Sequence, residues 1–518
     1  MKKISTSIII TSLFFILGTI GCKKFLTEEP LTQVPTKNYF KSLKDVNAAM
    51  AGVYGSFQEE MTGQGGTTSF TGKYNYWGEA RSDNFDIHPN YNNNIVRELT
   101  TNSLTSGNSI TDWSGLFRTI GRANTAIKYI PQAAALDNKV TVDIKNDNLA
   151  QCYAMRAMCY FQIIRLWGDA PIWTEPYEDY KVEDKKARET KAKIMNEVII
   201  PDLKKAYELI KKNQKPNVWL IGEAAIASTL ADVYLWRAGT ESQTADYQEA
   251  IVWFKNVFKA KAPSGKIYGG TVIGDLESAT DWKSKLFLDP TSSKEAIWSI
   301  YWDQLNNGCA CIPVSIGASN NNIRIDSAIH KNWKTDKTDL RITQTIDTLD
   351  GIGHYDKLLK YYNVPASGFT TTGPIASSYN VYLVMYRLGD VYLSYAEALN
   401  KTGDIAGALK YLNFVRQRSG LIAYTLVNPI VSTPDAMEDA LLAERRFELF
   451  GEGKRWFDLV RTKHVNKIMD PIINRRMTKI SGLPFTIGFG ADAGKLLSPL
   501  NRNVLEDNKK LVQNPTYL

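Results

Sequence analysis

Acidic and basic side chains alternate in the segment Glu444–Arg461, whose residue types could support acid–base chemistry. Glu444, Glu448 and Glu452 are four residues apart, so on a helix they form one stripe. A glycoside hydrolase needs two carboxylates that face each other across a cleft, and a single stripe does not supply that arrangement. The segment also contains Asp458 and four arginines, at positions 445, 446, 455 and 461. A structural ion-pair network explains this pattern more simply than catalysis, and we predict that the protein is not an enzyme.

Histidine and cysteine spacing gives no metal site. Cys152 and Cys159 are seven residues apart on an expected helix, too far to bridge each other, and are predicted to be core residues. Cys309 and Cys311 lie in an expected loop, where a strained disulfide and two free thiols both fit the sequence. The histidines match no spacing of zinc ligands: His88, His330, His354 and His464. The sequence also has no phosphate loop and no nucleophile elbow, so we predict no metal and no cofactor.

The amino terminus has the pattern of an export signal. Lys2 and Lys3 precede an apolar run from Ile4 to Ile20, which is short for a membrane-spanning helix. The run ends at Gly21-Cys22, which resembles a bacterial lipobox, in which the cysteine is lipidated and becomes the first residue of the mature chain. We therefore predict a signal peptide over residues 1–21 and lipidation of Cys22, which would hold the protein at a membrane surface. The alternative is an uncleaved anchor helix.

Composition is that of a globular protein. The chain has 518 residues, of which 44% are hydrophobic and 22% are charged, and its net charge is 62 − 54 = +8. This mild excess is spread along the chain without a dense run of lysine and arginine, so a nucleic-acid partner is not expected.

Helical hairpins supply the framework. Residues Tyr392, Tyr395, Ala396 and Leu399 share one helix face, and Gly403 provides the turn before a second helix. The same spacing recurs at Ala227, Leu230, Ala231 and Tyr234. The hairpins resemble tetratricopeptide repeats, which bury their apolar faces by stacking. Residues 262–385 interrupt the helices with loops and with strand-like pieces at Ala296–Tyr301 and Tyr379–Met385.

Taken together, the motifs resemble those of the SusD/RagB family over nearly the whole chain. The most specific run is Glu444-Arg445-Arg446, Glu448-Leu449, Glu452-Gly453, Arg455 and Phe457-Asp458-Leu459. Earlier motifs agree in order: Phe25-Leu26, Trp113, Arg156-Ala157, Gly168-Asp169-Ala170-Pro171, Arg387-Leu388 and Ala396-Glu397-Ala398. The resemblance implies an all-α, tetratricopeptide-like superhelix of about four helix pairs, with long loops and small β-pieces. We divide the chain into residues 1–21, 22–285 and 286–518, with the last two forming one compact domain.

The resemblance also implies a role at the cell surface. Proteins of this family are lipid-anchored in the outer membrane, bind nutrients, usually glycans or oligosaccharides, and deliver them to a TonB-dependent transporter resembling SusC. A minority handle peptides, as RagB-like members do. The alternatives are a tetratricopeptide-like scaffold that binds only protein, and peptide binding.

A glycan site needs aromatic faces for the C–H surfaces of the sugar and planar polar groups for its hydroxyls. Two loop-rich segments, near residues 74–94 and 302–333, combine these residue types outside the repeat helices. The residues predicted to bind ligand are Tyr74, Trp77, Arg81, Asp83, Asn84, Tyr91, Asn93, Trp302, Asn321 and Arg324. The alternative is that Trp77 and Trp302 pack the loops onto the scaffold and that the asparagine runs form turns.

Overall fold

The structure is a computed structural model that describes residues 39–63, 73–87, 94–178, 183–303, 323–349, 358–362 and 381–518. Most of these residues are helical, as the sequence predicts. The longer helices are α3 (Leu43–Thr62), α6 (Ser114–Leu136), α7 (Val142–Trp167), α9 (Ile200–Leu209), α10 (Glu223–Glu241), α11 (Asp246–Lys259), α16 (Leu388–Lys401), α17 (Ile405–Arg418), α18 (Pro434–Glu448) and α20 (Val465–Ser481). The shorter ones are α4 (Lys73–Asn75), α5 (Asn94–Thr100), α8 (Lys191–Ile194), α14 (Ser327–Trp333), α15 (Ile342–Thr345), α19 (Arg455–Arg461) and α21 (Arg502–Asp507).

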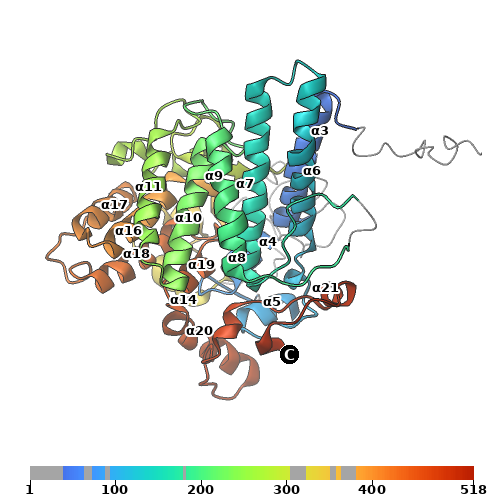
Figure 1. Ribbon diagram of the computed structural model, residues 1–518. Coiled ribbons are helices and arrows are strands. Elements are labelled where there is room, and N and C mark those ends of the chain that lie inside the picture. The colour runs from blue at the N-terminus through green and yellow to red at the C-terminus, as the bar shows by residue number, and fades with distance from the viewer. Residues whose placement is uncertain are drawn as a thin grey trace, which may run out of the picture.

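The long helices stand side by side in a row that follows the chain. Helix α3 packs on α6, α6 on α7, α7 on α9, α10 on α11, and α11 on α16, which packs on α17 and α18 (Figure 1). The predicted hairpins are confirmed as α10–α11 and α16–α17. In the second hairpin Gly403 has a φ of 91°, which a glycine adopts readily. The Asp404 side chain then accepts a 2.8 Å hydrogen bond from the Gly407 amide and caps α17.

Apolar spacing in the sequence predicts helices over residues 113–130 and about 146–167, and each of these predictions is wrong at one end by a few residues. Helix α6 does not end at Ile130 but continues through Pro131 to Leu136, and Ala133 on this extension is buried. Helix α7 begins at Val142, because the Thr141 hydroxyl caps it by accepting from the Ile144 amide. Tertiary packing and a capping residue therefore extend these two helices beyond the apolar stripes that marked them in the sequence.

Two small antiparallel sheets join segments that are distant in sequence. Strand β1 (Phe85–Ile87) pairs with β3 (Ile323–Ile325), and β2 (Ala296–Ile300) pairs with β4 (Leu383–Arg387). The first sheet brings together the two loop-rich segments that the sequence predicted to bind ligand. The second attaches the 262–385 segment to the start of α16, because β4 leads directly into that helix.

A single buried cluster of hydrophobic side chains runs through the molecule, from Phe40 near the start of the described chain to Leu511 near its end. Cys152 and Cys159 belong to it as free, buried thiols, as predicted. None of the helices within the described ranges is long and apolar enough to cross a membrane. Cys22, Cys309 and Cys311 lie outside the described residues.

Candidate functional site

Two of the aromatic residues predicted to bind ligand in the first segment, Tyr74 and Trp77, lie in the interior. The Tyr74 ring is 7% exposed, and its hydroxyl donates a 2.6 Å hydrogen bond to the carbonyl of Val384. Trp77 is 3% exposed, and its Nε1 donates to the Ile110 carbonyl over 2.9 Å. Its ring also packs edge-on against that of Trp167, with the centroids 5.6 Å apart. Both aromatic side chains therefore fasten the first segment to the helices.

The described charged and amide candidates of that segment, Arg81, Asp83 and Asn84, are buried as well. The Arg81 guanidinium lies 4.3 Å from the centre of the Trp456 ring. Asp83 forms ion pairs of 2.9 Å with Arg455 and 3.0 Å with Arg446. Asn84 is fully buried, and its Nδ2 donates a 2.8 Å hydrogen bond to the Glu79 carboxylate. These contacts tie the segment to α18 and α19.

In the second segment, Trp302 is 1% exposed and Arg324 is 9% exposed, with the Arg324 Nη2 3.8 Å from Asp86 Oδ2. Tyr91, Asn93 and Asn321 lie outside the described residues. The seven described candidates thus have the contacts of loop-packing residues, which is the alternative that the sequence left open. Ligand contact by the ten residues stays a prediction, and for these seven it would require a rearrangement that uncovers them.

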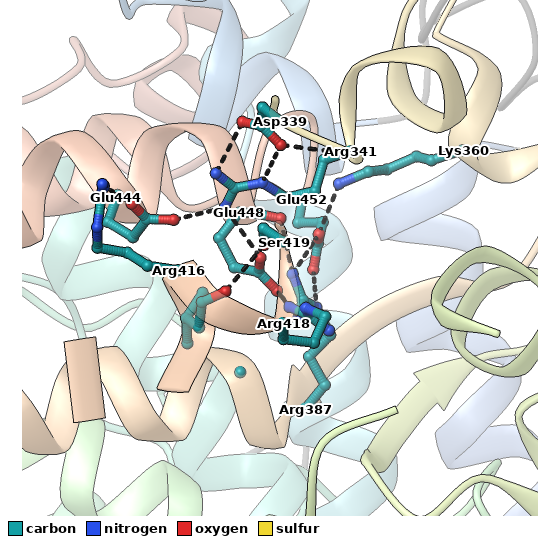
Figure 2. A network of polar contacts seen from close by, with 12 residues as sticks. Asp339, Arg341, Lys360, Arg387, Arg416, Arg418, Ser419, Glu444, Glu448 and Glu452 are labelled. Carbon is teal, nitrogen blue, oxygen red and sulfur yellow. Dashed lines mark hydrogen bonds and ion pairs between the residues drawn. The ribbon is translucent and has the colours of Figure 1, made fainter. Parts of the chain in front are cut away.

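The glutamate stripe forms an ion-pair network, as predicted, but its partners come from outside the segment and not from the interleaved arginines (Figure 2). Glu448 lies between Arg341, at 3.1 Å, and Arg387, at 2.5 Å, and it also pairs with Arg418. Glu452 pairs with Arg387 over 2.8 Å and with Lys360 over 2.7 Å. Side-chain exposure of these partners is 3% or less. The network connects α17, α18 and the start of α16 to the 262–385 segment.

Electrostatics at Glu448 argue against acid–base chemistry there. Burial alone would raise its pKa, but Arg418, Arg387 and Arg341 hold it well below its ordinary value. A general acid at neutral pH needs a raised pKa and access to a substrate. Glu448 has the opposite shift and is fully buried, so the stripe stabilises the fold.

Partly exposed aromatic side chains gather elsewhere, around Trp219, Tyr301 and Tyr382. The Trp219 ring centroid is 5.2 Å from that of Tyr301 and 4.7 Å from that of Tyr382. The two tyrosine rings are nearly parallel, at 22°, with centroids 5.4 Å apart. Tyr301 is 36% exposed. We call this group the aromatic corner.

The aromatic corner borders a cavity of about 480 Å³ between α3, α7 and the end of β2, here called the α3–α7 cavity. Planar amides and a phenol supply its polar lining, at Asn47, Tyr54, Gln58, Asn148 and Gln151. The remaining described lining residues are apolar or aromatic: Met50, Ala51, Gly55, Phe57, Trp219, Leu220, Trp298, Ile300 and Tyr301. Its volume and mixed lining are those of a small-molecule pocket.

Hydrogen bonds hold the lining in place. The Tyr54 hydroxyl donates to Gln151 Oε1 over 2.7 Å and accepts from the Ile221 amide over 2.9 Å. The loop that carries Trp219 is further fixed by the Ser299 amide of β2, which donates to the Val218 carbonyl over 2.9 Å. These hydrogen bonds preform the part of the wall that carries Tyr54 and Trp219.

A second cavity, of about 510 Å³, lies between the start of α6, the loop at 171–178 and α21. Trp173 and the half-exposed Tyr177 line it, with ring centroids 6.3 Å apart. Its lining includes charged side chains, among them Glu175, Asp184 and Lys185. We call it the α6–α21 cavity.

Sequence reasoning missed the aromatic corner. Its members are separated by more than eighty positions in the chain and lie in three different segments, so no spacing pattern links them. The sequence contains one partial indication of this group. Tyr301 ends the predicted strand Ala296–Tyr301, so it lies where a scaffold element leads into a loop. Among the described residues, no group of histidine, cysteine and carboxylate side chains is arranged to hold a metal ion.

The structure defines a class: a helical-repeat protein whose buried charges stabilise the fold and whose partly exposed aromatic rings border a cavity. Two family models match this chain. One, described as "SusD family", matches residues 323–517, and the other, described as "Starch-binding associating with outer membrane", matches residues 24–235. The chain belongs to the SusD family.

Individual relatives agree with this assignment. A SusD-like protein of Formosa agariphila is 24% identical over the full length of both chains. A SusD superfamily protein of Bacteroides vulgatus has the same fold, with a TM-score of 0.70 at 18% identity over 92% of this chain and 99% of that one. The surface glycan-binding protein A of Bacteroides uniformis gives a TM-score of 0.67 at 18% identity over 91% and 99% of the two chains.

Proposed function

We propose that the protein binds a glycan or oligosaccharide at the outer-membrane surface and delivers it to a TonB-dependent transporter resembling SusC. Family membership and the similarity to the surface glycan-binding protein A of Bacteroides uniformis support glycan binding. In this proposal Cys22 carries the lipid anchor and the protein has no catalytic role.

The observation that carries the proposal is the aromatic corner beside an amide-lined cavity. Tyrosine and tryptophan rings offer flat apolar faces that match the C–H side of a sugar ring, and their rims tolerate water. Side-chain amides both donate and accept hydrogen bonds, as sugar hydroxyls do. A cavity with both features and a preformed wall can bind an oligosaccharide without a large ordering cost.

Binding is tested by titrating a panel of soluble oligosaccharides into the purified mature protein in a calorimeter. We expect at least one to bind, and we expect Tyr301→Ala and Trp219→Ala to weaken that binding about tenfold or more, because each removes a stacking face. Tyr177→Ala is the matched control, since it removes a half-exposed tyrosine from the α6–α21 cavity. Absence of binding across the panel, with no transporter co-purifying, would contradict the proposal.

Attachment and partner are tested in the native organism. Cys22→Ala removes the proposed acyl acceptor, so we expect the protein to lose metabolic labelling with a fatty acid and to leave the outer-membrane fraction. Unchanged labelling would show that Cys22 is not the anchor. Affinity purification of the wild-type protein from detergent-solubilised outer membranes should recover a TonB-dependent barrel, and recovery of other partners instead would favour a protein-binding scaffold.

A further inference from the structure

The α3–α7 cavity is notable for the side chains it lacks. Among its described lining residues there is no aspartate, glutamate, lysine, arginine or histidine. The α6–α21 cavity includes Glu175, Asp184 and Lys185, and a groove beside α14 and α18 includes Asp336, Arg416 and further charged residues. The uncharged lining is therefore a property of this cavity and not of the protein surface in general.

Every described polar group in the lining is neutral. Asn47, Gln58, Asn148 and Gln151 carry amides, which have no charge at any physiological pH. Burial raises the pKa of Tyr54, so its hydroxyl remains protonated. A ligand in this cavity would thus meet hydrogen-bonding partners without meeting a counter-ion.

The aromatic corner is neutral at Tyr301. The Tyr301 hydroxyl donates a 3.1 Å hydrogen bond to the Asp303 carboxylate. Partial burial and this hydrogen bond raise the pKa of Tyr301, which keeps the phenol protonated. The corner therefore presents an uncharged ring to a ligand.

Moving a carboxylate or sulfate from water into a cavity lined by neutral groups is unfavourable. The anion loses hydration, and this loss is offset only when a cation or several charge-assisted hydrogen bonds replace the water. Proteins that bind anionic groups supply arginine or lysine for this purpose. The described wall of the α3–α7 cavity supplies neither.

We infer that the α3–α7 cavity selects uncharged glycans and rejects chains whose sugars carry carboxylate or sulfate groups. This inference rests on the proposed function and adds the chemical class of its ligand. The neutral amides recognise sugar hydroxyls, and the aromatic corner stacks against the sugar face.

The inference is tested with three forms of one oligosaccharide. The first is a neutral hexose oligosaccharide that the mature protein binds. In the second, the C6 hydroxymethyl groups are oxidised to carboxylates, and in the third those carboxylates are converted to methyl esters. The titrations are run at about 0.15 M salt, which screens the long-range attraction of anions to the net positive chain. We expect the carboxylate form to bind at least about tenfold more weakly than the neutral form, and the ester to recover most of the affinity.

A charge-introducing variant sharpens the result. Asn47 is exposed on α3 and lines the cavity, so Asn47→Lys places a cation there with little risk to the fold. We expect it to improve binding of the carboxylate form by about tenfold, because an ammonium group then partners the anion. Asn47→Gln is the matched control: because it adds no charge, any change in affinity that it causes should be the same factor for the neutral and the carboxylate forms.

Four results would overturn the inference. In the first, the carboxylate form binds as tightly as the neutral form. In the second, the ester is rejected like the acid, which would make size and not charge the cause. In the third, binding survives Tyr301→Ala and is lost in Tyr177→Ala, which places the ligand in the α6–α21 cavity and leaves the proposed function intact. In the fourth, no glycan of the panel binds in any form, which overturns the proposed function as well.

Discussion

Glu448 illustrates how this protein uses buried charge. Three arginines from three different segments surround it, and each has a further carboxylate partner. Arg387 contacts Glu295 and Glu452, Arg341 contacts Asp339 and Glu444, and Arg418 contacts Glu295. Bringing so many ions out of water costs free energy, and the pairs offset that cost only while every partner is present. The network is therefore sensitive to the removal of any one member.

Removing the Glu448 carboxylate tests this dependence. Glu448→Ala leaves three buried arginines short of a partner, so we expect the free energy of unfolding to fall by about 3–5 kcal/mol, or the protein to fail to fold. Urea denaturation followed by circular dichroism measures the change. Glu506→Ala on the exposed side of α21 is the control and should change stability by less than about 0.5 kcal/mol. Similar losses in the two variants would contradict this role for Glu448.

Titration of Glu79 makes the stability of the protein depend on pH. Burial raises its pKa to about 7, although hydrogen bonds from Asn84 and the Lys454 amide favour the charged form. An acid whose folded-state pKa lies above its unfolded value of 4.5 contributes its full stability below pH 4.5 and loses that contribution as the pH rises through 7. The loss amounts to at most about 3 kcal/mol.

Glu79→Gln removes this titration. We therefore expect the stability of the variant relative to wild type to rise between pH 5 and pH 8, as measured by urea denaturation at both values. Glu506→Gln, at an exposed position, should differ from wild type by the same amount at each pH. A Glu79→Gln difference that stays constant with pH would show that Glu79 is charged throughout this range.

At the scale of elements, hydrophobic periodicity predicts the helices but does not predict the strand pairing and side-chain contacts that connect them. The stripes at Ala227–Tyr234 and Tyr392–Leu399 lie within α10 and α16, because an apolar face marks a helix locally. The alternation of glutamates with arginines likewise predicted an ion-pair network but not its pairs, because Glu448 contacts Arg341, Arg387 and Arg418, which lie outside the segment. The pairing of β2 with β4 and the assembly of the aromatic corner depend on contacts across more than eighty positions, and no local pattern encodes them.

Helices α10 and α19 cross closely at Gly239. A Cβ built on Gly239 would lie 2.5 Å from the carbonyl oxygen of Arg461, closer than atoms can pack. Gly239→Ala should therefore destabilise the protein by about 1–3 kcal/mol, despite the better helix propensity of alanine. Thermal unfolding followed by circular dichroism at 222 nm measures this.

Gly121 in α6 provides the matched comparison. It is exposed and has no heavy atom within 4 Å of a built Cβ, so only helix propensity applies. Gly121→Ala should raise stability by up to about 1 kcal/mol. The proposed close crossing at Gly239 is contradicted if both alanine variants are stabilised equally.

At the scale of the whole molecule, the regions matched by the two family models pack on each other through buried groups. Tyr74 donates to the Val384 carbonyl, and Trp167 Nε1 donates to the Pro499 carbonyl over 3.1 Å. The carboxyl-terminal segment therefore packs against the first helices. Residues of α21 and of the start of α6 line the same cavity, and Figure 1 shows α21 near the lower end of α6. These contacts predict one cooperative unit and not two independent domains.

Calorimetry of Asp83→Ala tests that prediction. Asp83 lies in the amino-terminal half, but its arginine partners lie on α18 and α19. We expect wild type to unfold in one transition and the variant to unfold in one transition at lower temperature, with a loss of about 3–5 kcal/mol. Two transitions, of which the variant shifts only one, would divide the molecule into separate folding units.

The large sequence separation between Asp83 and its arginine partners also limits the order in which the chain can fold. Its partner Arg455 is 372 residues further along the chain. Strand β1 likewise cannot form its sheet until β3, which is distant in sequence, is present. Contacts so distant close large loops, which makes folding slow. A chain still emerging from the ribosome has an unmatched carboxylate and an unpaired strand until its last helices are made. We therefore expect the amino-terminal half to reach its native state only after the whole chain has been synthesised.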